Sequence, residues 1–305
     1  MSQKLDIKLV FALFSIALFW GTTYLAMRIG VETIPPILVT GLRNLIAGGI
    51  LFIYLKSNKQ LESMTLSRIK QNIIISFILI ILGNGLTTFS EKYISSGLAA
   101  LVASTIPLVV VLLNLALKHE RFSSKILLGI TIALCGIYFI YHSSIHDFVN
   151  PQYRIGIIAI LGAVLAWSIG TIYSKSVAVQ FGNILVDLCF QMLFAGIFLV
   201  VLQLMIDPHI HIFSWSFRSI GAVFYLAIFG SILGYTSYIY ALSKLPSTKV
   251  SVVNYVNVVV AVFLGWLILD EKVTLKMVFA TVFILSGVIV ANYPKRNIKL
   301  NKDAR

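Results

Sequence analysis

Long runs of apolar residues recur along the chain and limit its fold more than any other feature. A helix needs about 20 mostly apolar residues to cross the ~30 Å hydrocarbon core of a bilayer. Backbone groups in lipid must also form their hydrogen bonds within their own segment, which favours helices over loops. Ten runs meet these requirements and are predicted to be membrane-spanning helices: 9–27, 35–55, 72–90, 97–117, 125–142, 155–174, 184–206, 219–242, 248–269 and 274–293. We therefore expect an all-α integral membrane protein.

The composition agrees with a fold in lipid. Hydrophobic residues make up 59% of the 305 residues and charged residues 11%, whereas about a quarter of a soluble domain is charged. The net charge of +13 does not predict nucleic-acid binding, because the basic residues lie between the apolar runs rather than along one face. The lipid bilayer is therefore an expected partner, and nucleic acid is not.

The distribution of basic residues predicts the orientation. If the N-terminus lies in the cytoplasm, the segments on that side collect most of the 24 Lys and Arg residues. The segments on the opposite side receive only Arg28, Lys92, Arg154, Arg218, Lys272 and Lys276. The positive-inside rule then places both termini in the cytoplasm. We expect the plasma (inner) membrane as the location.

Two stretches of similar sequence occur in the two halves of the chain. "FWGTTYLAMRIG" begins at Phe19 and "AWSIGTIYSKSV" at Ala166, and each has a basic residue eight positions after its tryptophan. A longer block, "LGNGLTTFSEKYISSGLAA" from Leu82, matches "LGYTSYIYALSKLPSTKVS" from Leu233 without gaps. The chain therefore contains an internal repeat.

Each copy of the repeat holds five runs, so the second copy must enter the membrane from the opposite side. We predict two inverted five-helix repeats, 1–145 and 150–296, followed by a polar cytoplasmic tail, 297–305. Inverted-topology repeats are typical of secondary transporters, because two similar halves in opposite orientation can exchange conformations. The repeats would place Trp20 and Trp167 on opposite sides of one central cavity.

These features resemble the EamA branch of the drug/metabolite transporter superfamily over about residues 9 to 293. The resemblance rests on "FWGTTYLAMRIG", on "VTGLRNLIAGG" in the second run, and on "GLAALVASTIPLVVVLLNLALKHERFS" with its counterpart "TKVSVVNYVNVVVAVFLGWLILDEKVT". It implies a ten-helix fold and secondary transport, in a family that moves amino acids, other metabolites and drugs. One position departs from the pattern: Pro107 is matched by Val258, which argues against a proline-dependent break in the ninth run.

The functional prediction is a secondary transporter, or permease, that exports a small organic metabolite such as an amino acid by alternating access. Export is implied by the resemblance alone. A broad-specificity drug efflux carrier, a channel, and a multi-span enzyme acting on a lipid-linked substrate are the alternatives. No P-loop, HExxH or Gly-x-Ser-x-Gly motif is present, and we expect neither a cofactor nor a metal. The oligomeric state is left open between a monomer and a homodimer.

Arg43 is the most informative candidate residue, because it lies inside the second run. A charge at such a depth costs at least ~2.5 kcal/mol and should face the bundle interior or a watery cavity. Its planar guanidinium is suited to bidentate contact with a substrate carboxylate or phosphate. A structural role is the alternative, in which Arg43 binds helix carbonyls, pairs with Glu32 or Glu91, or extends outward.

The other candidates for substrate binding are aromatic or amide residues inside the runs. Aromatic rings can stack on a planar or cationic ligand, and amides can line a cavity or join neighbouring helices. The full set with Arg43 is Trp20, Tyr24, Arg43, Asn84, Trp167, Gln191, Tyr235, Asn254 and Asn257. Gln191 is included because the repeat matches it to Arg43.

Three acidic residues lie close to ends of the predicted helices. Glu120 and Glu271 precede the polar starts of two runs, where the helix dipole favours a carboxylate, so both are interpreted as structural. Asp187 lies at the start of the seventh run and is the one acid that could titrate inside the bundle.

Overall fold

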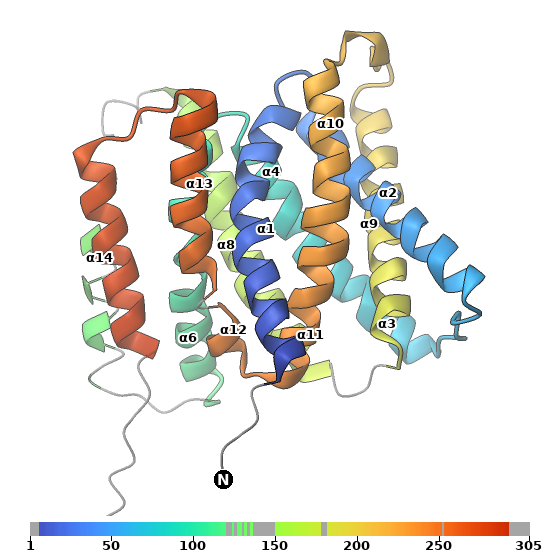
Figure 1. Ribbon diagram of the computed structural model, residues 1–305, viewed down its shortest axis with the longest axis horizontal. Coiled ribbons are helices and arrows are strands. Elements are labelled where there is room, and N and C mark those ends of the chain that lie inside the picture. Colours follow the sequence, from blue (N-terminus) through green and yellow to red (C-terminus); the bar gives the residue numbers. More distant parts are fainter. Residues whose placement is uncertain are drawn as a thin grey trace, which may run out of the picture.

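The computed structural model describes residues 6–119, 150–177, 182–251 and 253–292, with positions 124, 127–129, 131, 132, 135 and 136. These residues form helices joined by short connections, and no strand occurs in this part of the chain. The helices stand side by side in a bundle, and α1 begins at the end that is lowest in Figure 1.

The first half of the chain begins with two long helices, followed by two that are divided into segments. Asp6 caps the first helix through Lys8 N–H and Leu9 N–H, and Pro36 opens the second, where a missing N–H removes no helical hydrogen bond. The segments are α1 (Ile7–Gly30), α2 (Pro36–Ser57), α3 (Leu66–Ile75), η1 (Ser76–Asn84), α4 (Gly85–Ser90), α5 (Ser96–Ala103) and α6 (Ile106–Ala116).

The second half repeats this order, with two long helices followed by two that are divided into segments. Asn183 caps α9 through Leu185 N–H, and Ser216 caps α10 through Ser219 N–H. The segments are α8 (Pro151–Val177), α9 (Ile184–Ile206), η4 (Ile212–Ser214), α10 (Phe217–Tyr225), η5 (Leu226–Tyr235), α11 (Thr236–Lys244), α12 (Ser247–Ser251), α13 (Asn254–Leu269) and α14 (Leu275–Asn292).

Seven helices in the described ranges are long and apolar enough to cross a membrane: Ile7–Gly30, Pro36–Ser57, Leu66–Ser90, Ser96–Ala116, Pro151–Val177, Ile184–Ile206 and Phe217–Lys244. They correspond to seven of the ten predicted spans. Shorter apolar helices cover parts of the ninth and tenth runs, Val256–Leu269 and Met277–Gly287. The fifth run, 125–142, falls mostly outside the described residues.

The bundle exposes many large apolar side chains and buries several polar ones among its apolar core. Phe11, Phe14 and Met205 are exposed, whereas Thr40 and Asn72 are fully buried. A surface of this kind would be unstable in water but suits lipid, where buried polar groups can bond to neighbouring helices. The structure therefore supports an integral membrane protein.

Two spans contain π-helical segments, which the sequence pattern did not predict. η1 lies between α3 and α4, and η5 lies between α10 and α11. Such segments replace the usual hydrogen bonds with i→i+5 bonds and are frequent at functional sites. Each segment ends within an aligned block of the repeat, which starts at Leu82 in one half and at Leu233 in the other. In each half a residue three positions after the segment, Thr87 or Tyr238, lines the central cavity described below.

The contact between α2 and α9 depends on a glycine in each helix. A Cβ at Gly48 would lie 2.8 Å from Leu193 Cγ, and a Cβ at Gly196 would lie 2.7 Å from Leu45 Cγ. The two contacts are equivalent under the repeat, because Gly48 matches Gly196 and Leu45 matches Leu193 in the alignment of the two halves. In each contact the glycine of one half faces the leucine of the other. The small residues allow the two backbones to approach closely.

Breaks occur in both the fourth and the ninth spans. α5 ends at Ala103, and Pro107 lies in the first turn of α6. α12 ends at Ser251 and α13 starts at Asn254, although Val258 stands where the proline would be. The absence of a proline from the ninth run therefore did not indicate a continuous helix, because the division lies several residues before Val258.

Candidate functional site: a central polar cavity

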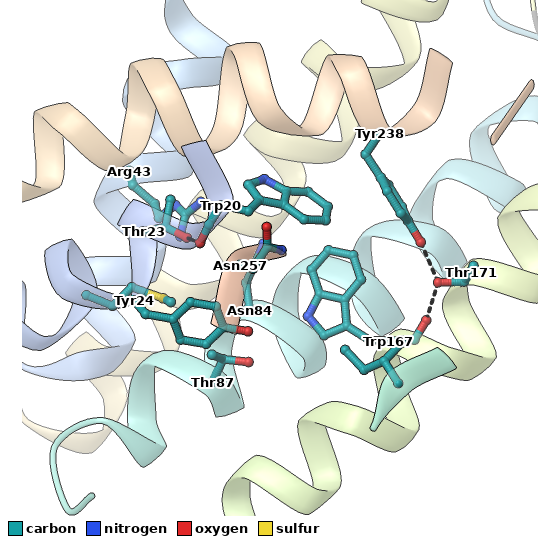
Figure 2. A pocket seen from close by; sticks show the side chains of 12 residues that line it. Trp20, Thr23, Tyr24, Arg43, Asn84, Thr87, Trp167, Thr171, Tyr238 and Asn257 are labelled. Carbon is teal, nitrogen blue, oxygen red and sulfur yellow. Dashed lines mark hydrogen bonds between the residues drawn. The ribbon is translucent and has the colours of Figure 1, made fainter. Parts of the chain in front are cut away.

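A cavity of ≈ 40 Å³ lies inside the bundle, between helices from both halves of the chain. Figure 2 shows the side chains around it, with Arg43 and Thr23 at one side and Tyr238 and Thr171 at the other. The cavity is lined by Trp20, Thr23, Tyr24, Met27, Arg43, Asn84, Thr87, Ile106, Trp167, Thr171, Tyr238 and Asn257. Six of these residues were candidates from sequence: Trp20, Tyr24, Arg43, Asn84, Trp167 and Asn257.

Arg43 supplies the positive charge of the cavity wall and is 3% exposed. Its Nε donates to Ser231 Oγ at 3.1 Å, and Gly230 leaves room for Nη2, since a Cβ there would lie 2.8 Å from that atom. Nη1 has no hydrogen-bond partner among the described residues. In the same part of the chain Arg43 makes no ion pair with Glu32 or Glu91, so these two versions of its structural role are not realised.

Trp20, Trp167 and Tyr238 form an aromatic cluster in the wall of the cavity. The ring centroids of the two tryptophans are 5.2 Å apart, and that of Tyr238 lies 4.9 Å from Trp20 and 5.6 Å from Trp167. The two tryptophans were expected on opposite sides of the cavity, but their rings are in contact. The cluster offers a broad aromatic surface for a ligand.

Glycines in the π-helical segments explain how the two tryptophans reach the centre. The Trp20 indole contacts Gly234 in η5, and its Nε1 donates to Gly230 O at 3.1 Å. The Trp167 indole packs against Gly83 in η1, where a Cβ would lie 3.0 Å from Nε1. Each tryptophan therefore lies on the π-helical segment of the other half of the chain.

Two further candidates, Gln191 and Tyr235, do not line the cavity. They belong to a chain of buried hydrogen bonds in which Tyr235 OH donates to Gln191 Oε1 at 3.1 Å, and Gln191 Nε2 donates to Asn72 Oδ1 at 2.6 Å. Asn72 Nδ2 continues the chain to Asp187 Oδ1 at 2.7 Å. The side chain of Asn254 lies outside the described part of the structure.

Asp187 ends this chain in an ion pair with Arg68. Arg68 Nε donates to Oδ1 at 2.7 Å and Nη2 donates to Oδ2 at 3.1 Å. Arg68 also binds Asn183 O and the exposed Glu62 carboxylate. Asp187, which the sequence left open as an acid that could titrate, is therefore held by an arginine and an amide.

The sequence pattern did not indicate Thr23, Met27, Thr87, Ile106 and Thr171 as cavity residues. Tyr238 flanks the glycines of the eighth run, as Tyr235 does, and the sequence left its role open between lining the cavity and bonding to a neighbouring helix. Helical spacing could have found some of them. Thr171 follows Trp167 by four positions and Tyr238 follows Gly234 by four positions, which places each pair on one helix face. Tyr238 OH and Thr171 Oγ1 are also hydrogen-bonded to one another.

Basic residues bind backbone carbonyls at both ends of the bundle. Arg28 Nη1 donates to Glu91 O, and Lys175 Nζ donates to Leu242 O at 2.6 Å. Both basic residues come from the matched tryptophan stretches, and both carbonyls lie at matched positions of the longer block. Cations are favourable near helix C-termini, where carbonyls have no helical partner.

Seven membrane-length helices in the described part of the chain, with a buried polar cavity between them, define a multi-span membrane protein. This chain belongs to the EamA-like transporter family, whose sequence pattern matches it twice, over residues 7–142 and 154–293. It is therefore a membrane transporter.

Two relatives and one solved structure illustrate the similarity. The chain is 32% identical to "Uncharacterized inner membrane transporter YedA" of Escherichia coli K12, over 83% of this chain and 80% of the relative. It is 23% identical to "Uncharacterized transporter YoaV" of Bacillus subtilis, over 94% and 97%. A crystal structure 20% identical in sequence superposes with a TM-score of 0.68 over 95% of this chain and 98% of the other, which supports the fold.

Proposed function

We propose that this protein is a secondary transporter that exports a small anionic or zwitterionic organic metabolite, such as an amino acid or a related compound, across the inner membrane. The observation that carries the proposal is the buried Arg43 guanidinium at the cavity, with Nη1 unpartnered among the described residues. An uncompensated buried charge is strongly unfavourable. A carboxylate that binds Arg43 would remove this penalty and accept the unused hydrogen bond.

Alternating access by two inverted five-helix repeats, 1–145 and 150–296, is the proposed mechanism. Contacts that recur at matched positions support it: the Gly48–Leu193 and Gly196–Leu45 contacts, and the two tryptophans on opposite π-helical segments. The cavity volume of ≈ 40 Å³ is also far below the ~300–1,000 Å³ of typical ligand pockets. A metabolite could therefore enter only after the surrounding helices separate.

The orientation belongs to the same proposal. Both termini would lie in the cytoplasm, as the distribution of basic residues predicts. The inner membrane is supported by the printed name of the YedA relative, and the export direction by the resemblance to EamA proteins.

Broad-specificity drug efflux is the second candidate, and the aromatic cluster favours it. Three rings within 5.6 Å of one another could accept planar or cationic compounds by stacking and cation–π contact. The two candidates differ in the predicted role of Arg43, because a cationic drug would be repelled by the guanidinium rather than bound.

A thermal-shift screen of the purified protein tests the proposal. Compounds that bind the folded state raise its apparent stability, by about 2.7 kcal/mol at a hundred times the Kd. We expect carboxylates and amino acids to raise Tm in the wild type but much less in Arg43→Lys, which keeps the charge but loses the forked geometry. A library in which only aromatic cations raise Tm would favour drug efflux.

Counterflow in proteoliposomes then distinguishes a carrier from a channel and from an enzyme. A compound found in the screen should exchange against its labelled form, with a rate that saturates. Flux that rises in proportion to concentration without exchange would indicate a channel, and chemical conversion of the compound would indicate an enzyme.

A further inference from the structure

Glu91 is a buried carboxylic acid with no hydrogen-bond partner for its side chain among the described residues. It follows the last residue of α4 as the C-cap, and its relative exposure is 0%. Neither Oε1 nor Oε2 is reached by a donor from this part of the chain. A buried polar group without a partner is rare in folded proteins, and each case requires an explanation.

The residues around Glu91 do not neutralise a charge on it. Arg28 on α1 donates to the backbone carbonyl of Glu91, while the carboxylate remains unbound. Tyr24 on α1 and Glu271 from the α13–α14 connection interact with it electrostatically. From α8, Gly156 faces the neighbouring backbone of Ser90 and adds no charge.

Glu271, a second acid in the same region, has hydrogen-bond donors for both of its side-chain oxygens. Its Oε1 accepts from Ser96 N at 2.8 Å, and its Oε2 accepts from Gly97 N at 3.1 Å. The Ser96 hydroxyl lies 2.9 and 3.0 Å from the two oxygens. Both oxygens of Glu271 are thus supplied with donors, whereas neither oxygen of Glu91 is reached by one in the described part of the chain.

Burial raises the pKa of Glu91 well above its usual range, and the nearby Glu271 charge raises it further. Arg28 opposes these effects but does not outweigh them. Two acids in one region with opposite environments are the usual arrangement when one of them carries a proton at neutral pH.

Glu91 is also connected to the central cavity through α1. Thr88, three residues earlier on α4, donates to Met27 Sδ at 3.1 Å. Met27 and Tyr24 both line the cavity. A single movement of α1 away from α4 would therefore both open the wall of the cavity and expose the Glu91 carboxyl to water.

We propose that Glu91 is a proton-binding site whose protonation holds this end of the bundle closed. In the closed state the carboxyl carries its proton and stays buried. When α1 and α4 separate, the proton leaves for water, and the resulting carboxylate is stabilised by water and by the Arg28 guanidinium. Coupling of this proton to substrate flux rests on the proposed function, whereas proton binding and closure do not.

The thermal unfolding midpoint tests proton binding directly. An acid whose pKa is raised in the folded state keeps its proton there while the unfolded chain has lost its own. The wild type should therefore lose stability as pH rises from the ordinary Glu value of about 4.3 towards the raised pKa. We expect the Tm of the wild type to fall relative to that of Glu91→Gln by about 2–3 °C per pH unit in this window. Glu32→Gln, at an exposed position of the same end, is the matched control and should follow the wild type.

Tryptophan quenching tests closure without any substrate. In a Trp215→Phe, Trp266→Phe background, only Trp20 and Trp167 at the cavity report. Acrylamide quenching should increase with pH in this parent in lipid nanodiscs, and should stay at the low-pH value in the parent with Glu91→Gln added.

Three outcomes would overturn the proposal: a parent whose quenching does not change with pH, a Glu91→Gln variant that titrates like its parent, or equal pH dependence of Tm in the wild type and Glu91→Gln. A failed ligand screen with both pH signals intact would refute the proposed substrate class and leave the proton site standing.

Discussion

Positions 43 and 191 are matched in the two halves of the chain, yet their side chains have different surroundings. Arg43 lies at the central cavity with one guanidinium nitrogen unpartnered among the described residues. Gln191 bonds to Asn72 and Tyr235 and does not line the cavity. The same place in two similar halves therefore serves structure in one and offers a free donor in the other.

A second matched pair differs in the same way. Arg28 and Lys175 each bind a backbone carbonyl at the end of a span, but the carbonyl belongs to Glu91 in one half and to Leu242 in the other. Only the first half places an acid there. Matched contacts thus form the scaffold, and the departures from matching mark the residues that we assign to substrate and proton.

Within the buried hydrogen-bond network that contains Gln191, the largest loss of stability is expected on removal of the Asp187 carboxylate. Asp187→Ala leaves Arg68 and Asn72 without their buried partner, and breaking a buried ion pair costs about 3–5 kcal/mol. We expect a large fall in Tm. The matched control is Glu62→Gln, which removes the exposed partner of the same arginine and should leave Tm nearly unchanged, since exposed ion pairs contribute little. Equal decreases in Tm for the two variants would show that burial does not make the Asp187 ion pair more important for stability than the Glu62 ion pair.

The role of Arg43, whose Nη1 has no hydrogen-bond partner among the described residues, can be tested by substitution. Arg43→Ala should reduce the affinity for an anionic or zwitterionic substrate by roughly 10- to 150-fold, the equivalent of one charge-assisted hydrogen bond. Gln191→Ala should instead lower Tm, with a much smaller effect on affinity. Binding isotherms and thermal unfolding of both variants provide the measurement. Full transport by a folded Arg43→Ala protein would show that Arg43 is structural.

The matched scaffold predicts a smaller and equal effect in both halves. Gly48→Ala and Gly196→Ala each force a Cβ against a leucine of the facing helix, and overpacking of this kind costs about 1–3 kcal/mol. Gly49→Ala is the control, because no atom lies within 4 Å of the added Cβ, and it should be neutral. Strongly unequal falls in Tm would weaken the proposed symmetry.

The sequence predicted the class of fold and much of the cavity, because polar or charged residues within apolar runs must face the interior. Arg43, Asn84 and Asn257, which this reasoning assigns to the interior, line the cavity. It did not separate Gln191 and Tyr235 from them, since a side chain bonded to another helix and one lining a cavity both avoid lipid.

Contacts between distant residues were not predictable in this way. Glu271 was interpreted as a carboxylate at the start of its own helix, but it binds the N-terminal N–H groups of α5. Nothing in the sequence near Glu91 indicates that its carboxyl lacks a partner. Both features depend on how α1, α5 and the α13–α14 connection pack, which local pattern does not determine.

The π-helical segments have a consequence for helical phase. A π turn takes up one more residue than an α turn, so each one rotates the following residues by about 100° relative to a continuous α-helix. Within a single span, α10 packs against α1 and α2, whereas α11 packs against α1, α8, α9 and α12. Periodicity counted from residue 217 onward would assign Tyr238 to the wrong face. The phase has to be restarted after each of these segments, and in each half a residue of the helix that follows, Thr87 in α4 or Tyr238 in α11, lines the cavity.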